Sequence, residues 1–298
     1  MTTIWQPVEA THQDVVTPAA ASALHDLLDR DGDPPGVGSP LPLLWHWLAF
    51  LPQARQSDLG EDGHPRTGTF LPPADGRSRM YAGGRIAIGS APAVGEPLTR
   101  TSRVSDVARK KGRTGDLMFV TVDHELASDR AAIHERQNIV YRDARRFEAR
   151  EAPELREDAH AWVWGRDVRI EPTLLFRFSA LTYNAHRIHY DRDYATDVEG
   201  YPALVVHGPL QAVLLADAVA RFFPCRAVRS FEFRALAPAF DDHDLRLRLK
   251  GSSLGEAAED APTGGATVEV AAFSGHVKTM TAAAALEPAP AAVSFTAF

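Results

Sequence analysis

The chain has 298 residues, of which 45% are hydrophobic and 24% charged, and a formal net charge of −7 at pH 7. This is the composition of an ordinary globular protein, long enough for two domains or one large one. The acidic balance argues against a general nucleic-acid-binding protein, which is usually basic. The single cysteine, Cys225, excludes an internal disulfide and a CxxC zinc site.

The N-terminus and the apolar runs bear on the cellular location of the chain. The first residues show no basic region followed by an apolar one, so we expect no signal peptide. No apolar run approaches the roughly 18 residues that a membrane-spanning helix needs. We therefore expect a cytoplasmic protein that has neither a membrane nor a nucleic acid as its partner.

The first half of the chain has the pattern of helices followed by strands. Residues 18–30 are rich in alanine and leucine, which predicts a helix, and the apolar run 41–51 predicts a short buried helix. Residues 54–79 are polar and rich in glycine and proline, which indicates a long surface loop, and such loops are often functional. Strands are predicted at residues 80–89, 98–107, 116–126 and 133–142.

The second half repeats this order of elements. Residues 143–168 are charged and lack a clear period, so we expect the domain link there, with domains at 1–150 and 151–298. A strand is expected at 173–180 and a helix at 210–223, followed by strands at 227–235, 244–251, 266–273 and 276–284. The fold class is therefore expected to be α+β, with two units that each combine a sheet and a helix.

The stretch from Leu181 to Leu210 contains the densest polar chemistry in the chain. Asn184, His186, Arg187 and His189 fall within a few residues, and His207-Gly208-Pro209 opens the helical pattern further on. A proline suits the first helical turn, where its missing N–H costs nothing. The free N–H groups at such a helix start are natural donors to an oxygen that gains negative charge.

This stretch resembles the R-specific enoyl-thioester hydratase/dehydratase family, also called MaoC-like. The usual motif there is Gly-Asp-x-Asn-Pro-x-His, followed about twenty residues later by His-Gly at the start of a central helix. Here Asn184 replaces the acid, His186 the asparagine and Arg187 the proline, while His189 and His207-Gly208 are retained. The variant is similar to a subgroup that contains mitochondrial-type 3-hydroxyacyl-thioester dehydratases and bacterial mesaconyl-CoA and itaconyl-CoA hydratases. The resemblance implies a double hot-dog fold, with two curved antiparallel sheets each wrapped around a central helix.

The resemblance also implies roles for individual residues. His189 is expected to move the proton, because an imidazole can take and return a proton near neutral pH. The backbone N–H of Gly208 is expected to hold the thioester oxygen as it becomes enolate-like. Asn184 does not titrate, so we expect it to orient water or substrate. His186 is equally well explained as a site member or as a structural hydrogen-bonding residue, and His207 is expected to be mainly structural.

Several basic residues are candidates for binding the substrate. Arg187 either pairs with Asp191 or Asp193 to hold the loop, or binds a substrate carboxylate through its planar fork. A basic turn at residues 108–115 is ordinarily a solvated loop, but it is also a candidate clamp for coenzyme A phosphates or a phosphopantetheine arm. Its candidate residues are Lys110, Lys111 and Arg113. The first half, including residues 41–51, is expected to shape the acyl pocket.

The resulting expectation is a hydro-lyase that acts on an enoyl-CoA or 3-hydroxyacyl thioester. We expect no metal or redox cofactor, with coenzyme A or phosphopantetheine entering only as part of the substrate. A branched dicarboxylyl-CoA is the first choice of acyl group and a medium-chain acyl group the second. An acyl carrier protein stays open as an alternative carrier, and a homo-oligomer, such as a homodimer, is expected.

Three other functions stay open on the sequence. A hot-dog thioesterase commonly needs a carboxylate near the helix start, and residues 208–211 supply none. A non-catalytic acyl-binding module would keep the fold without needing His189. A zinc enzyme would draw its ligands from His186, His189, Asp191 and His207, although their spacing lacks the HExxH pattern.

Overall fold

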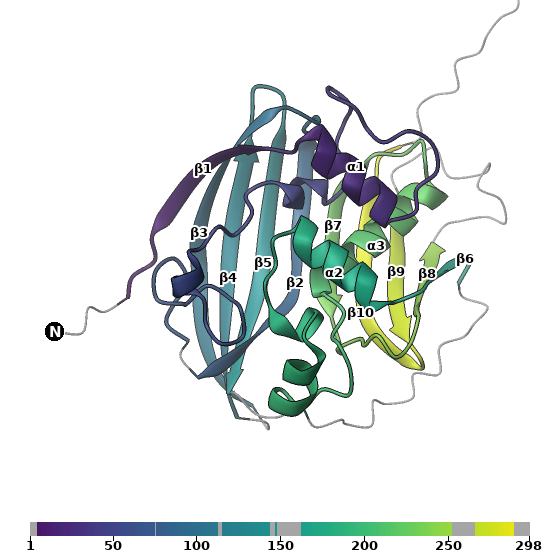
Figure 1. Cartoon of the computed structure of the whole chain (residues 1–298). Coiled ribbons are helices and arrows are strands. Elements are labelled where there is room, and N and C mark those ends of the chain that lie inside the picture. The colour runs from purple at the N-terminus through teal and green to yellow at the C-terminus, as the bar shows by residue number, and fades with distance from the viewer. Residues whose placement is uncertain are drawn as a thin grey trace, which may run out of the picture.

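The computed structural model describes residues 5–74, 76–112, 115–143, 147, 162–251 and 266–288. Within these residues, one antiparallel sheet of ten strands has the order β1-β3-β4-β5-β2-β7-β10-β9-β8-β6 (Figure 1). The N-terminal half supplies β1 (Glu9–Val15), β2 (Arg77–Ser90), β3 (Pro97–Gly112), β4 (Gly115–Ala127) and β5 (Ala132–Asp143). The C-terminal half supplies β6 (Trp164–Val168), β7 (Val228–Ala235), β8 (Leu245–Gly251), β9 (Ala266–Ser274) and β10 (Val277–Leu286).

The two halves of the sheet join where β2 pairs with β7. Gly83 lies opposite Arg234 and Gly84 opposite Phe233 in this pairing. A side chain at Gly83 would place its Cβ 2.3 Å from the Phe233 carbonyl oxygen, and the φ angle of Gly83 is +141°. Only glycine fits this close approach, so the sequence Gly83-Gly84 allows the two halves to form one sheet.

Three helices cover this sheet in the described part of the chain: α1 (Pro18–Leu27), α2 (Pro172–Leu181) and α3 (Gly208–Phe222). Figure 1 shows them on one side of the sheet, with α3 crossing the strands of the C-terminal half. Every residue of α3 from Leu210 to Val219 is buried, so this helix is the centre of the hydrophobic core. None of the described helices is long and apolar enough to cross a membrane.

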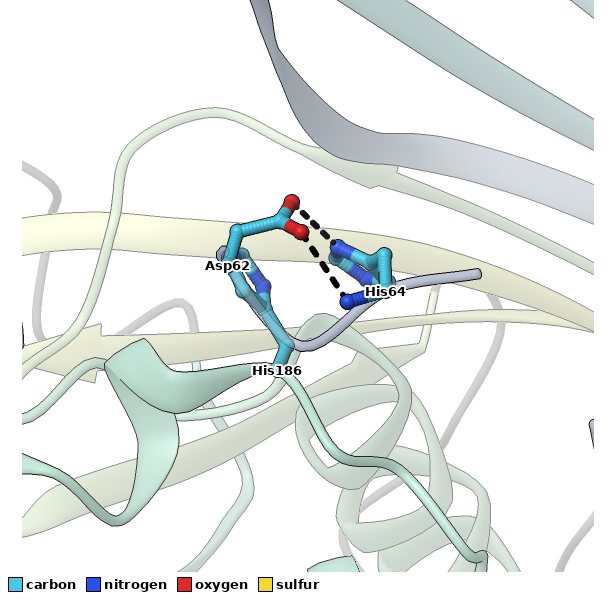
Figure 2. A group of neighbouring side chains, drawn as sticks. All are labelled: Asp62, His64 and His186. Atoms are coloured by element: carbon cyan, nitrogen blue, oxygen red, sulfur yellow. Dashed lines mark hydrogen bonds and ion pairs between the residues drawn. The ribbon is translucent and has the colours of Figure 1, made fainter. Parts of the chain in front are cut away.

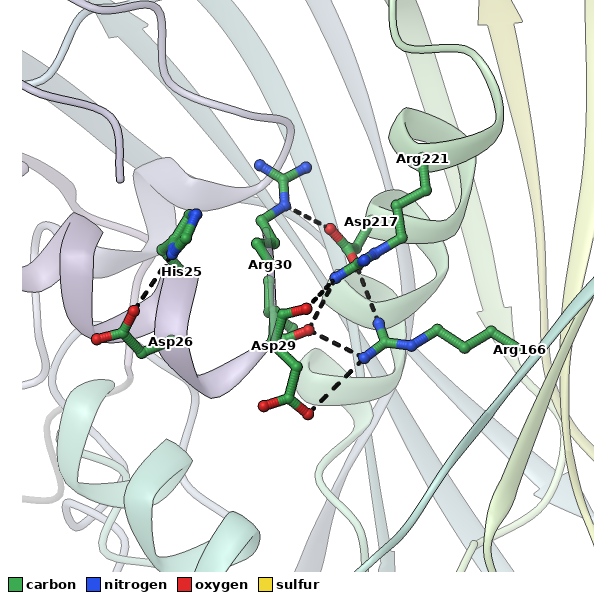
Figure 3. A network of polar contacts seen from close by, with 8 residues as sticks. His25, Asp26, Asp29, Arg30, Arg166, Asp217 and Arg221 are labelled. Atoms are coloured by element: carbon green, nitrogen blue, oxygen red, sulfur yellow. Dashed lines mark hydrogen bonds and ion pairs between the residues drawn. The ribbon is translucent and has the colours of Figure 1, made fainter. Parts of the chain in front are cut away.

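A buried carboxylate fixes α3 to its neighbours. Asp217 accepts hydrogen bonds from Arg30 at 2.6 Å, Arg221 at 2.7 Å and Arg166 at 3.2 Å (Figure 3). Its side chain is almost completely buried, whereas the three arginines reach the surface. The cluster links the end of α1 and strand β6 to the central helix, and so holds in place the helix whose first turn faces the candidate site.

The structure corrects several expectations. Residues 173–180 form helix α2 and not a strand, because Pro172 occupies the first turn and Leu175, Phe178 and Ser179 share a buried face at helical spacing. The run 41–51 contains only a 3-10 turn, Trp45–Leu48, preceded by Leu44 with a φ of +69°. It is therefore not the buried helix that was predicted, and the described N-terminal half has no long central helix like α3.

Other expectations differ in extent. Strand β6 lies within the expected link 143–168, and β1 had no clear sequence signal; both are edge strands. The basic turn at 108–115 is largely strand, because β3 extends to Gly112 and β4 begins at Gly115. The remaining predicted strands and the helices at 18–30 and 210–223 are confirmed within a few residues of their ends. The domain boundary near residue 150 stays a prediction.

Candidate active site

A cavity of about 940 Å³ lies at the first turn of α3 and is lined by both halves of the chain. The N-terminal half contributes polar residues from its strands and loops, and the C-terminal half contributes the motif predicted from the sequence. The groups that offer polar atoms to the cavity include the backbone of Gly208 and the side chains of His46, His64, Arg79, Arg100, Glu135, Gln137, Arg142, Asn184, His186 and His189.

His189 lies at the end of a 3-10 turn, Arg187–His189, and is buried. Its Nδ1 atom lies 2.7 Å from the carbonyl oxygen of Val205. A carbonyl oxygen only accepts, so Nδ1 carries the proton and Nε2 keeps its free lone pair. Burial lowers the pKa of His189 to about 3, although the hydrogen bond to Val205 acts in the opposite direction. The imidazole is therefore neutral and available as a base at physiological pH.

His207 supports this ring from one side. The two imidazole rings are stacked, with centroids 3.7 Å apart and planes inclined by 22°. His207 is completely buried, and its Nε2 atom forms a 2.8 Å hydrogen bond with the Ser179 hydroxyl group. Burial lowers the pKa of His207 well below its ordinary value. These contacts fit the structural role that the sequence suggested for His207.

Gly208 is the first residue of α3 and lines the cavity. Its N–H has no carbonyl group one helical turn earlier to bind, and Pro209 has no N–H. A Cβ on Gly208 would lie 3.4 Å from the ring of Tyr81, so the position has little space for a side chain. This geometry provides a backbone donor that an oxyanion in the cavity can use.

Asn184 shapes the loop that carries the histidines. Its Oδ1 atom accepts a hydrogen bond from the backbone N–H of His186 at 3.0 Å, and its backbone N–H donates to the backbone carbonyl of Ser179 at 2.8 Å. The side-chain NH2 group is not needed for either contact. Asn184 therefore has a structural task and also a donor that can reach a ligand in the cavity.

A turn from the N-terminal half, residues 60–64, lies against this loop, and the motif analysis did not identify it. The backbone N–H of Arg187 donates to the Asp62 carbonyl at 2.9 Å, and Gly63 approaches Ala185 so closely that a Cβ would lie 1.9 Å from its oxygen. The turn lies within residues 54–79, the loop that we expected to be functional from its length. Its pattern Asp62-Gly63-His64 was the available signal.

This turn places two further titratable groups beside His186 (Figure 2). Asp62 accepts from the side chain of His64 at 2.9 Å and from its backbone N–H at 3.0 Å. The ring centroid of His64 lies 4.1 Å from that of His186, which lies 5.3 Å from that of His189. Burial, followed by the charges of His64 and His189, lowers the pKa of His186 well below its ordinary value. His186 is therefore a member of a continuous histidine cluster.

Asp62, His64 and His186 also offer ligand atoms within 4.8 Å of one another, so the group could hold a metal ion. These are not the four residues suggested by the sequence, since Asp62 and His64 replace His189, His207 and Asp191. Both carboxylate oxygens of Asp62 already accept hydrogen bonds from His64. Asp62 is thus already paired with His64, and a metal would have to compete with that pairing.

Three of the basic residues chosen from the sequence, Arg187, Lys110 and Lys111, lie outside the cavity lining. Arg187 binds Asp191 at 2.7 Å and the Glu61 carbonyl at 3.1 Å, and its guanidinium lies over the Tyr194 ring at 4.1 Å. It therefore holds the loop, as the first of its two expected roles required. Lys110 lies over the Phe119 ring on the β3–β4 hairpin, with Lys111 beside it. Arg113 lies outside the described residues, and the role of all four in substrate binding stays a prediction.

Solved structures with a similar backbone define the fold class of the chain. A MaoC-like dehydratase from Phytophthora capsici superimposes with a TM-score of 0.66 at 13% identity, covering 96% of this chain and 97% of that one. A Mycobacterium tuberculosis protein described as having a double hot-dog fold gives 0.55 at 14% identity, covering 96% of each chain. The predicted double hot-dog fold is confirmed.

Sequence comparison identifies the family within this class. Residues 44–241 match the model of the hydroxyacyl-thioester dehydratase type 2 family, and the chain belongs to that family. The mesaconyl-C(4)-CoA hydratase of Chloroflexus aurantiacus is 45% identical over 236 residues, which cover 79% of this chain and 84% of that protein. The mitochondrial hydroxyacyl-thioester dehydratase type 2 of Schizosaccharomyces pombe is 40% identical over 90 residues, 30% of this chain and 29% of that one. The chain is a hydro-lyase, as the resemblance implied.

Proposed function

We propose that this enzyme catalyses the reversible hydration of an enoyl-CoA thioester whose acyl group is a short, branched dicarboxylate of the mesaconyl-C(4) type. The similarity to the Chloroflexus hydratase over most of both chains supports this substrate class. The observation that carries the chemistry is the hydrogen bond from His189 Nδ1 to Val205, because it leaves Nε2 as a base in the cavity.

In the proposed mechanism, His189 Nε2 takes a proton from water as the water oxygen forms a bond to Cβ of the double bond. The electron pair of the double bond moves to the thioester oxygen, which the Gly208 N–H holds as an enolate. The His189 imidazolium then returns the proton to Cα, so the hydrogen and hydroxyl group of one water molecule are both added. Asn184 orients the attacking water through its amide group. The reverse sequence dehydrates a 3-hydroxyacyl thioester.

A dehydratase for medium-chain 3-hydroxyacyl thioesters is the second candidate. The volume of the cavity, about 940 Å³, and its apolar residues favour this function, because they offer space beyond a short branched diacyl group. Phe50, Leu51, Phe176 and Phe178 are among these apolar residues. A thioesterase is less well supported, since Gly208, Pro209, Leu210 and Gln211 provide no carboxylate at the helix start.

The carrier and the setting of the reaction are part of the same proposal. Coenzyme A is the carrier, and an acyl carrier protein is the alternative. The reaction uses no metal and no redox cofactor, because proton transfer and oxyanion binding are sufficient for this chemistry. The enzyme acts as a homodimer in the cytoplasm.

The test follows the absorbance of the enoyl-thioester band with mesaconyl-C(4)-CoA, crotonyl-CoA and 2-octenoyl-CoA. The wild type should consume the band, and His189→Ala should lose activity by about 1000-fold, within the range for a general base. His134→Ala is the matched control, because His134 is an exposed residue of β5. Equal turnover by His189→Ala would reject this mechanism. A folded wild type that is inert with all three thioesters would favour an acyl-binding protein.

A further inference from the structure

The charges that line the cavity are unevenly paired. Arg79, Arg100 and Arg142 contribute positive charge to the lining, and Glu135 contributes negative charge. Asp62 lies just behind the lining residues Gly63 and His64.

Both nearby carboxylates are fully engaged by other donors. Glu135 accepts hydrogen bonds from His46 at 2.8 Å, Trp47 at 2.9 Å and Gln137 at 2.7 Å. Burial raises the pKa of Glu135, but the hydrogen bond from His46 and the nearby positive charges lower it to about 2, so it is ionised. Asp62 binds His64 through both oxygens.

Two of the three arginines have their own contacts. Arg100 lies over the Phe50 ring at 4.5 Å, and the negative charges of Glu135 and Asp14 act on it. Arg142 donates to the Tyr201 hydroxyl at 3.4 Å. Burial raises the pKa of the neighbouring Glu199, and the charge of Arg142 acts against this rise.

Arg79 lacks both kinds of contact. Like Arg100, whose buried Nε has no hydrogen-bond partner, it forms no ion pair or hydrogen bond among the residues that the structure describes. Unlike Arg100, it lies over no aromatic ring in that part of the chain. It lies on β2 opposite Tyr141 of β5, at the cavity, and is half-buried. Burial lowers the pKa of both His64 and His186, and the positive charge of Arg79 acts in the same direction. Arg79 is therefore an uncompensated cation close to the histidine cluster.

We propose that Arg79 binds the free carboxylate of a dicarboxylyl-thioester substrate and so selects this acyl class. The inference rests on the proposed function and assigns one residue to its substrate specificity. In a mesaconyl-C(4) thioester, the free carboxyl group is bonded directly to the methyl-bearing Cβ that receives water. Its partner must therefore lie in the same cavity as the base, as Arg79 does. A guanidinium pairs with a carboxylate through two parallel hydrogen bonds, which fixes orientation as well as charge.

This role replaces the carboxylate-binding role that the sequence offered for Arg187. The Arg187 guanidinium is committed to Asp191 and the Glu61 carbonyl, and it does not line the cavity. Arg79 is a half-buried cation without a partner among the described residues, so binding of an anionic ligand would stabilise it.

The test compares Arg79→Gln and Arg79→Lys with wild type, using mesaconyl-C(4)-CoA and crotonyl-CoA. Arg79→Gln should lower kcat/KM for mesaconyl-C(4)-CoA roughly 100-fold, as expected for loss of a desolvated charge pair, and leave crotonyl-CoA within about threefold. Arg79→Lys should have a kcat/KM for mesaconyl-C(4)-CoA between those of wild type and Arg79→Gln, because it keeps the charge and loses the planar guanidinium. Arg77→Gln is the control, since Arg77 lies two positions earlier on β2, faces Asp143 at 3.8 Å and is not part of the cavity lining.

Binding of unreactive saturated analogues separates this inference from the catalytic proposal. Isothermal titration with succinyl-CoA and butyryl-CoA should show that Arg79→Gln weakens only succinyl-CoA. Equal losses for both analogues would mean that Arg79 contacts coenzyme A phosphates, and no loss for either would also reject the inference. If binding changes as expected while no thioester is hydrated, the proposed reaction fails and the carboxylate-binding role stands. If crotonyl-CoA is hydrated and succinyl-CoA binds no better than butyryl-CoA to wild type, the inference alone fails.

Discussion

The imidazole ring of His207 lies flat against that of His189, with 3.7 Å between the ring centroids. Both rings are buried, and a charge on His189 lowers the pKa of His207. Two imidazolium ions cannot be held this closely at low dielectric without a large cost. The resting pair is therefore neutral, and the site accepts one proton at a time.

The first prediction concerns the pH dependence of activity. Because burial lowers the pKa of His189 to about 3, its base form is present throughout the neutral range. We expect kcat/KM for crotonyl-CoA to be constant between about pH 6 and pH 8, and to fall only well below the ordinary histidine pKa of about 6.5. Initial rates at low substrate concentration measure this directly. An acid limb centred near pH 6.5 would contradict the buried, neutral state of His189.

The second prediction concerns the pH dependence of stability. The pKa of His189 is lowered from 6.5 to about 3 on folding, so between these values the unfolded chain binds a proton that the folded chain does not. The stabilisation is complete above the unfolded pKa and is lost as the pH falls toward the folded one. The free energy of unfolding should drop by about 1.4 kcal/mol per pH unit for each such histidine.

Urea denaturation between about pH 5 and pH 7.5 tests this slope. His186 and His207 shift in the same direction, so the wild-type slope should exceed that of one histidine. His207→Gln should have a shallower slope than wild type, whereas the exposed His134→Gln should not. Parallel curves for all three proteins would argue against the depressed pKa values.

The third prediction tests the turn at residues 60–64. Gly63→Ala should weaken activity at least tenfold, because its Cβ would lie 1.9 Å from the Ala185 oxygen and the φ of +88° disfavours alanine. The turn then moves away from the loop that carries His186. Gly32→Ala is the control: it shares a positive φ of +78° but has no atom within 4 Å of the added Cβ. Equal effects on kcat in both variants would show that backbone strain alone, and not the docking of the turn, matters.

The fourth prediction separates stability from chemistry. Asp217→Asn removes the charge that three arginines share and should lower the free energy of unfolding by about 3 kcal/mol. Asp217 lies in α3 beyond the first turn, so KM at a temperature where the variant is folded should stay near the wild-type value. Thermal unfolding and steady-state kinetics measure the two effects. A variant with normal stability would mean that the cluster is energetically neutral.

The fifth prediction concerns metal ions. Dialysis of the purified enzyme against a chelator should leave kcat unchanged, because the Asp62–His64 hydrogen bonds already satisfy the only described group with metal-ligand spacing. Elemental analysis of the protein before and after dialysis is the accompanying measurement. The contrary outcome is that chelation abolishes activity, with zinc restoring it in the wild type but not in His64→Gln. That result would establish a metal site there and overturn the proposed mechanism.

The sequence by itself determined the elements whose signals are local. Alternation of apolar residues marked most strands, and the run after His207-Gly208 marked the buried helix α3. Asn184, His186, His189 and Gly208 could be grouped because they lie on one loop and at the helix start that follows it. A hydrogen bond from an N–H group to the preceding helical turn, or its absence, is a local property, so the free N–H of Gly208 was also predictable.

Only the tertiary structure decided the contributions of the N-terminal half. Glu61 and Arg187 are 126 positions apart, and no local pattern states that their segments meet. The same holds for His64 and for Arg79, which reach the histidines because β2 pairs with β7 and the turn at 60–64 docks on the loop. A periodic pattern reports which face of an element is buried but not its partner. It also leaves short apolar runs ambiguous, which is why residues 173–180 formed a helix where a strand was predicted.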